Sequence, residues 1–376
     1  MKNMNIKQKV AHNLKNMIGC SVKKKYLIIE SDDWGSIRMP SLEALERLKA
    51  KGVSLEKGDS KRYNNTDTLA SKEDFEQLFN TLIEFKDQLG NHPVFTAMSV
   101  VANPDFQKIK ESNFQKFYHE PFTKTLERYG RADAFQMWQK GVEEKLFHPE
   151  FHGREHLNAG AWMRQLQAND EHTHWAFEEG CWAFNNKLAV NYQAAFNLEK
   201  ASDLELQREI LSSGLDLFEE IHGYKARFLV PPNGFFNNQL VEIAAGKGVD
   251  YMGISKFQIE PLGDGKYKKN FHWIGKKNKY LQTYLTRNAF FEPNAPGKDW
   301  HSDCLNEIHY AFKWNKPAVI SSHRTNFIGS LNAKNREESL MALKKLLKEV
   351  LKRWPDVRFI TSTQLGDIIT GKTQEK

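Results

Sequence analysis

The sequence contains few cysteines and no long apolar run. Its 376 residues include three cysteines, Cys20, Cys181 and Cys304, and none belongs to a Cys-x-x-Cys pair. This spacing excludes a disulfide framework and indicates reduced, structural cysteines. No stretch approaches the 18 apolar residues of a transmembrane helix, and residues 1–25 lack the continuous apolar centre of a secretory signal. We therefore expect a cytoplasmic protein without a transmembrane segment, although the amphipathic stretch 5–18 leaves a role at a membrane surface open.

Nucleic-acid-binding motifs and linkers are also missing. No zinc finger, RNP-type or helix-turn-helix pattern is visible, so we expect no nucleic acid partner although the net charge is +7. The scattered lysines indicate a solvated surface with a bias toward anionic ligands. The sequence has no repeats and no Gly/Ser-rich linker, and 40% of its residues are hydrophobic. These features predict a single globular domain over residues 1–376, with a core at about 26–365.

Short apolar runs alternate with amphipathic, helix-like runs, which favours a parallel α/β architecture. The expected strands are residues 26–31, 93–100, 147–152, 226–231, 250–255, 317–322 and 357–362. The expected helices are residues 71–89, 131–146, 159–179, 202–222, 237–247, 299–315 and 335–353. Ser202 and Glu205 have the spacing of a capping box at the start of 202–222. The segment 256–298 breaks the alternation and reads as a hairpin-like insertion, so we predict one barrel-like sheet with insertions.

Two neighbouring aspartates, Asp32 and Asp33 in "YLIIESDDWG", end the first expected strand. Neighbouring side chains on a strand point to opposite faces, but both can reach one site where the strand turns. Two close carboxylates repel each other unless a cation or a shared proton lies between them. The pair therefore indicates a metal or a shared proton, and the alternative is that one of them caps the following turn.

Three histidines in "HPEFHGREHLN" lie within or shortly after another expected strand, residues 147–152. His152 and His156 have the His-x-x-x-His spacing that lets two imidazoles share a metal ion, whereas His148 lies four residues further back. Pro149 and Gly153 argue against one continuous helix. We expect His152 to end a strand and His156 to follow on a loop or helix start.

Two further strands end in chemically useful residues. In "VPPNG", the prolines fix the backbone before Asn233 and Gly234, and such a turn can hold a backbone N–H for an oxyanion. In "SSHRT", His323 can act as a general acid or a metal ligand. The following Arg324 can orient a carboxylate or hold an anionic group.

In this order, the motifs "SDDWG", "HGREH", "VPPNG" and "SSH" resemble those of the polysaccharide deacetylase superfamily, the NodB-homology or carbohydrate esterase 4 fold. The resemblance spans roughly residues 26–365 and implies a (β/α) barrel, distorted and seven-stranded. It implies Asp32 as general base, His323 as general acid, and Asp33, His152 and His156 as metal ligands. The substrate-binding residues that we expect on this basis are Trp34, Pro232, Asn233, Arg287 and Arg324.

The sequence departs from the family pattern at two points. The usual arginine of the third motif is replaced by Val230, so Arg287 or Arg324 would have to tune Asp32. The family's aspartate that polarises the late histidine has no clear counterpart, and Asp250 is the candidate.

The expected function is that of a metal-dependent hydrolase acting on an amide bond. It would remove N-acetyl groups from a sugar or glycan precursor, with metal-bound water as the nucleophile. The ligand set suits Zn²⁺, with Co²⁺, Ni²⁺, Mn²⁺ and Fe²⁺ as alternatives. The expected partner is a carbohydrate, and the basic charge leaves an anionic group on it open. Two other hypotheses remain: a metal-independent glycoside hydrolase that uses Glu292 and Asp32, and a non-catalytic glycan-binding protein on a decayed deacetylase scaffold.

Overall fold

A parallel sheet forms the centre of the molecule in the computed structural model, which describes residues 5–373 except 58, 59 and 189. The sheet has nine strands: eight follow the order β10-β7-β6-β5-β2-β1-β12-β11, and β13 pairs with the start of β1 on the edge opposite β12. All pairings in it are parallel. Its strands are β1 (Tyr26–Trp34), β2 (Phe95–Ser99), β5 (Phe147–Phe151), β6 (Phe228–Leu229), β7 (Tyr251–Gly253), β10 (Thr283–Leu285), β11 (Ala289–Phe290), β12 (Ala318–His323) and β13 (Arg358–Phe359).

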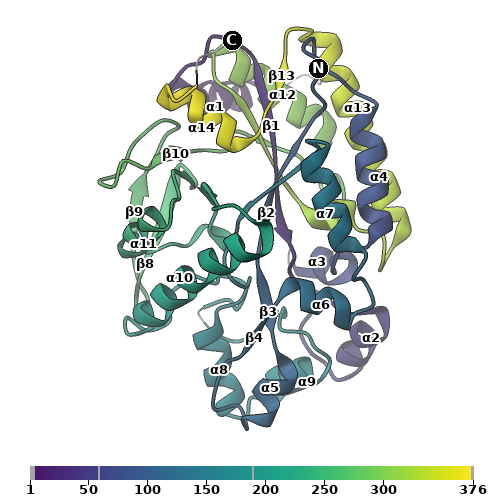
Figure 1. The fold of residues 1–376 in the computed structure, drawn as a ribbon, viewed down its shortest axis with the longest axis vertical. Helices are drawn as coiled ribbons and strands as arrows, with labels where there is room; N and C mark the ends of the chain where they lie inside the picture. Colours follow the sequence, from purple (N-terminus) through teal and green to yellow (C-terminus); the bar gives the residue numbers. More distant parts are fainter. Residues whose placement is uncertain (1–4, 58–59, 189, 374–376) are drawn as a thin grey trace.

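Helices surround this sheet (Figure 1). Helices α4, α7, α12 and α13 supply much of the largest apolar core cluster, which also includes Leu27 and Ile29 of β1. Every residue of β1 is buried, as expected for a central parallel strand covered on both faces. The helices are α1 (Ile6–Met17), α2 (Leu42–Ala50), α3 (Ser60–Thr66), α4 (Lys72–Ile83), α5 (Phe106–Glu111), α6 (Phe122–Arg128), α7 (Ala134–Glu143), α8 (Ala159–Gln167), α9 (Glu171–Glu178), α10 (Asp203–His222), α11 (Val241–Gly246), α12 (Trp300–Lys313), α13 (Ala333–Arg353) and α14 (Ser362–Thr370).

The sheet is a distorted (β/α) barrel, as predicted. Its two terminal strands are not hydrogen-bonded to each other, and the short link between them crosses the open side. The two ends of the strand order, β10 and β11, are consecutive in the sequence and are separated by residues 286–288 alone. All seven expected strands are present. The two extra strands of the sheet, β10 and β11, come from the segment 256–298, which the sequence pattern assigned wholly to an insertion.

The first part of that segment is a separate antiparallel hairpin of β8 (Phe257–Gly263) and β9 (Lys266–Phe271). A second small antiparallel pair consists of β3 (Ala102–Pro104) and β4 (His119–Pro121). Among the described residues, no helix has the length and apolar character needed to cross a bilayer.

Two local predictions about helices are wrong. The expected helix 159–179 is two helices, because Asn169 adopts a left-handed φ of 55° and Asp170 begins α9 by accepting a hydrogen bond from the Thr173 N–H. The expected capping box of α10 does not form, since the Ser202 side chain makes no capping hydrogen bond. Instead, the Asp203 carboxylate accepts a hydrogen bond from the Lys200 N–H at 3.1 Å.

Candidate active site

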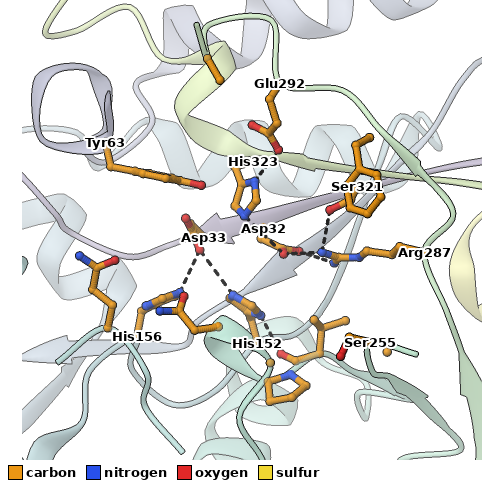
Figure 2. A pocket seen from close by; sticks show the side chains of 18 of the residues that line it. Asp32, Asp33, Tyr63, His152, His156, Ser255, Arg287, Glu292, Ser321 and His323 are labelled. Carbon is orange, nitrogen blue, oxygen red and sulfur yellow. Dashed lines mark hydrogen bonds and ion pairs between the residues drawn. The ribbon is translucent and has the colours of Figure 1, made fainter. Parts of the chain in front are cut away.

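Both neighbouring aspartates face one cavity because β1 is irregular where it ends. Its register with β2 shifts between Ser31 and Trp34, and Asp33 has a left-handed φ of 76°. A regular strand would send the two carboxylates to opposite faces, and this bulge brings both of them to the same side. Asp32 and Asp33 line a cavity of about 980 Å³ at the carboxyl ends of the strands. Figure 2 shows the two carboxylates among the histidines of the site.

Two histidines converge on Asp33. Residue His152 directly follows β5, and Gly153 then bends the chain with a φ of 114° so that His156 returns to the same place. The Nε2 atoms of His152 and His156 lie 3.4 Å and 3.1 Å from Asp33 Oδ1. The three potential ligand atoms are mutually within 4.8 Å, and all three residues are buried. The geometry therefore brings the three expected metal ligands together.

The chemistry of these side chains fits a divalent cation. His152 Nδ1 lies 2.7 Å from the Val230 carbonyl oxygen, an acceptor, so Nδ1 carries the proton and the Nε2 lone pair faces the centre. Burial lowers the pKa of His156, against the attraction of Asp33, which favours the neutral imidazole that a metal needs. Burial disfavours ionisation of Asp33, but His156 and His152 hold its pKa well below the usual value. One carboxylate and two imidazoles are a common ligand set for Zn²⁺ and related ions.

Asp32 is held by an arginine from the link between β10 and β11. Nη1 and Nη2 of Arg287 each donate to one oxygen of Asp32 at 2.6 Å. The same guanidinium donates from Nε to Glu30 at 2.5 Å and from Nη1 to Ser321 at 3.0 Å. Burial opposes ionisation of Asp32, yet the adjacent guanidinium lowers its pKa below the usual value. Of the two arginines considered for this role, Arg287 is the one that contacts Asp32.

His323 stands opposite Asp32 because their strands pair in register. The ladder between β1 and β12 aligns Asp32 with His323, and Nε2 of His323 lies 3.8 Å from Asp32 Oδ2. Nδ1 of His323 lies 2.6 Å from Oε1 of Glu292. Burial lowers the pKa of this imidazole, but the Glu292 carboxylate outweighs burial and raises it to about 9. His323 is therefore protonated at neutral pH.

Glu292 is itself fixed by two donors. Its Oε2 accepts hydrogen bonds from Arg62 Nη1 at 2.7 Å and from Asn326 Nδ2 at 2.9 Å. The acid that polarises His323 is thus Glu292, and the Asp250 assignment is wrong. Asp250 instead pairs with Arg227 at 2.8 Å and with Lys372 at 3.0 Å.

The turn after β6 borders the cavity through its backbone. Residues 232–234 form a single 3-10 turn in which Asn233 has a φ of 54° and Gly234 a φ of 73°. Asn233 and Gly234 line the cavity beside Pro231, whereas Pro232 is buried behind them. The preceding Val230 carbonyl orients His152, as described above. The turn therefore borders the candidate metal site, and the residue Val230 before it orients one candidate ligand.

Three other residues from the sequence motifs lie outside the cavity. Trp34 is buried and packs against Phe75, with a ring-centroid distance of 5.3 Å. Arg324 has no exposed surface and donates to Asp67 at 3.0 Å and to the Ser36 carbonyl at 2.7 Å. His148 stacks on Tyr224 with ring centroids 5.8 Å apart. These side chains support the fold around the site.

The cavity also contains residues that the sequence motifs did not indicate. The ring of Tyr63 on α3 lies edge-on to His323, with centroids 5.6 Å apart. The guanidinium groups of Arg38 and Arg62 lie 4.3 Å and 4.5 Å from the Tyr63 ring. Arg38 Nη1 is 3.8 Å from Asp33 Oδ2. These residues come from loops and a short helix rather than from strand ends, so no motif pointed to them.

The sequence matches no protein-family model and no curated protein. Solved structures with a similar chain fold include the following three, whose descriptions differ from one another. A putative polysaccharide deacetylase from Mycobacterium smegmatis is 12% identical, with 95% of this chain and 97% of that chain covered and a TM-score of 0.44. A 4-alpha-glucanotransferase from Thermococcus litoralis is 9% identical, with 94% and 41% covered and a TM-score of 0.43. A carbohydrate esterase 4 family pseudoenzyme from Bacillus anthracis is 11% identical, with 92% and 66% covered and a TM-score of 0.35.

Proposed function

We propose that the protein is a metal-dependent deacetylase that hydrolyses the N-acetyl group of a sugar or glycan precursor. One observation carries the proposal. A cavity holds the triad Asp33, His152 and His156, and it also holds an ionised carboxylate, Asp32, facing a protonated imidazole, His323. A base and an acid beside a metal-binding triad are the parts that amide hydrolysis needs.

Asp33, His152 and His156 would hold the cation, and Zn²⁺ suits this donor set, with Co²⁺, Ni²⁺, Mn²⁺ and Fe²⁺ as alternatives. The bound ion supplies Lewis acidity that lowers the pKa of water and polarises an acyl oxygen. Asp32 is ionised and faces the cavity, so it can accept a proton from the attacking water. Arg287 fixes the carboxylate by two hydrogen bonds and thereby sets its direction.

His323 serves the second proton transfer. Its protonated ring can donate from Nε2 to the leaving amine while Nδ1 remains bonded to Glu292. The low pKa of Asp32 and the high pKa of His323 keep the base deprotonated and the acid protonated over the same pH range. The two groups therefore do not compete for one proton near neutrality.

The lining of the cavity suits a carbohydrate. Its volume of about 980 Å³ is at the upper end of ordinary small-molecule sites. Amides and one indole on its wall can bond to hydroxyl groups or stack on a sugar ring: Asn185, Asn191, Gln193 and Trp300. We therefore propose a saccharide, rather than a small amide, as the substrate.

Asp32→Asn is the direct test. We expect acetate release from N-acetylated saccharides to fall by about 10² to 10⁴ in kcat, because the amide cannot accept the proton. Bound metal, measured by elemental analysis, should stay near one ion per chain, since Asp32 is not a ligand. His148→Asn, which changes a histidine outside the cavity, should leave both quantities unchanged. Full activity of Asp32→Asn would rule out this residue as the base.

The glycoside hydrolase alternative is less well supported. It needs Glu292 or Asp32 as a protonated acid. Burial opposes ionisation of Glu292, but His323 and Arg62 lower its pKa, so it remains a carboxylate. Sugar release that is insensitive to chelators would favour this alternative over deacetylation.

A further inference from the structure

Helix α1 exposes its apolar side chains, whereas its one buried residue, Asn16, is polar. Ile6, Val10, Leu14 and Met17 are 80%, 51%, 58% and 51% exposed. Their spacing of three or four residues places them on one face of the helix. A surface helix of a globular protein ordinarily turns such a face toward the core. This apolar face therefore needs a separate explanation.

Polar side chains of α1 fix the helix to the rest of the protein. The buried Asn16 accepts a hydrogen bond from Asn288 Nδ2 at 3.0 Å. Asn13 Oδ1 accepts a hydrogen bond from Trp314 Nε1 at 2.9 Å. The ammonium group of Lys15 lies 3.3 Å from a carboxylate oxygen of Glu307. These bonds fix the rotation of the helix, so the apolar face cannot turn inward without breaking them.

The two segments beside this face have a net positive charge. Residues 5–29 contain six lysines and neither aspartate nor glutamate. The backbone N–H of Cys20 donates to the Ile274 carbonyl at 2.9 Å, which joins this segment to the one around the β8–β9 hairpin. That second segment, residues 256–279, contains seven lysines against Glu260 and Asp264. The two segments together have a larger net positive charge than the whole chain, whose net charge is +7.

We propose that α1 binds the surface of an anionic lipid bilayer. Ile6, Val10, Leu14 and Met17 enter the boundary between headgroups and acyl chains, and the surrounding lysines contact the headgroups. An extended anionic surface is the partner that matches an apolar stripe beside two adjoining segments with a net positive charge. The exposed rings of Phe257 and Phe271 on the hairpin, 72% and 39% exposed, add apolar surface in the second segment.

The docking face adjoins the cavity. Lys15 of α1 and Lys256 and Phe257 at the start of β8 line the cavity that holds the metal triad. The Lys256 ammonium donates to the backbone carbonyl of Lys15, so the two segments meet at this wall. Docking through α1 therefore brings the cavity wall close to the headgroup layer. The docking itself does not depend on the deacetylase proposal.

Vesicle sedimentation of the full chain tests the proposal. We expect binding to vesicles that contain about one third phosphatidylglycerol, weaker binding at high salt, and little binding to phosphatidylcholine alone. Leu14→Glu should weaken binding by at least about tenfold, because a leucine side chain is withdrawn from the apolar layer. The matched control is Met341→Glu on α13, whose side chain is equally exposed at 62%, and its binding should be unchanged.

A double variant and a matched control test the contribution of the lysines. Lys7→Gln with Lys9→Gln should weaken binding by about tenfold or more, whereas Lys345→Gln with Lys348→Gln on α13 should not. Equal losses in both pairs, or no binding to anionic vesicles, would overturn the proposal. So would a lipid-free dimer that Leu14→Glu dissociates, since the apolar face would then be a contact between copies. Circular dichroism should show that all variants remain folded, because every altered side chain is exposed.

Discussion

At the scale of single residues, the site depends on two charged contacts that shift proton affinity in opposite directions. Arg287 holds Asp32 in its ionised form, and Glu292 holds His323 in its protonated form. Both carboxylates are buried and their cationic partners are only partly exposed, so solvent screens these contacts little. The direction of each pKa shift is what the proposed role requires: the carboxylate accepts a proton and the imidazole donates one.

Glu292→Gln should move the alkaline limb of the activity profile. The Glu292 charge raises the pKa of His323 to about 9, so its removal lowers that pKa and deprotonates the acid at a lower pH. We expect the alkaline limb of kcat/KM to shift by at least about one pH unit toward neutrality. The paired His323 also contributes stability below its unfolded pKa, which is lost as pH rises through about 9.

A control for this measurement is Glu120→Gln. Glu120 is also buried and pairs with Arg128 at 2.5 Å, but it does not line the cavity. Its pH profile should match that of the unaltered protein. An unshifted alkaline limb in Glu292→Gln would show that His323 is not the group that limits activity at high pH.

Residues at strand ends could be predicted from the sequence, and residues on loops could not. Asp32, His152 and His323 stand where apolar runs stop, and parallel strands bring such points to one edge. Tyr63 lies on a short helix within an irregular stretch, and its approach to His323 depends on tertiary packing alone. Arg287 was found as a candidate, but its bond to Asp32 depends on the link between β10 and β11, which the sequence pattern did not separate from the hairpin.

At the scale of elements, the end of β1 contacts both the candidate active site and the apolar core. Trp34 closes the strand one residue after Asp33, and it is 1% exposed. Its ring meets Phe147 of β5 with centroids 4.9 Å apart, and its Nε1 donates to Ser31 at 3.0 Å. The sequence predicted Trp34 as a substrate-binding residue, but the structure buries its side chain in the core and outside the cavity, because β1 is irregular beside it.

Trp34→Ala should therefore reduce stability rather than substrate affinity. Removing a buried indole should lower the free energy of unfolding by about 3 to 5 kcal/mol, measured by denaturant titration. Trp34→Phe keeps most of the apolar volume and should leave KM for an acetylated saccharide near its original value. A large rise in KM in Trp34→Phe with unchanged stability would instead assign the side chain to substrate binding.

At the scale of the whole molecule, the candidate metal site brings together distant parts of the chain. Asp33 belongs to β1, and the two histidines follow β5, which is separated from β1 in the sheet by β2. The barrel class followed from the alternation of apolar and amphipathic runs. The two extra strands were missed because runs of two or three residues carry no periodic signal.

A bound ion should therefore stabilise the complete fold. Zn²⁺ at about 100 times its dissociation constant should add about 2.7 kcal/mol, and Tm should rise by several degrees and fall again with a chelator. His156→Ala should abolish this rise, and His148→Ala should retain it, because His148 is outside the triad. An equal rise in both variants would place the ion elsewhere.

The three-residue link between β10 and β11 has a mechanical consequence. Arg287 lies in this link, which connects the first and last strands of the sheet order. Its side chain donates hydrogen bonds to Asp32 on the central strand β1. The guanidinium thus ties the link at the open side of the barrel to the central strand β1. A motion that displaces this link also releases the Asp32 carboxylate, so opening of the barrel and loss of the oriented proton acceptor should occur together.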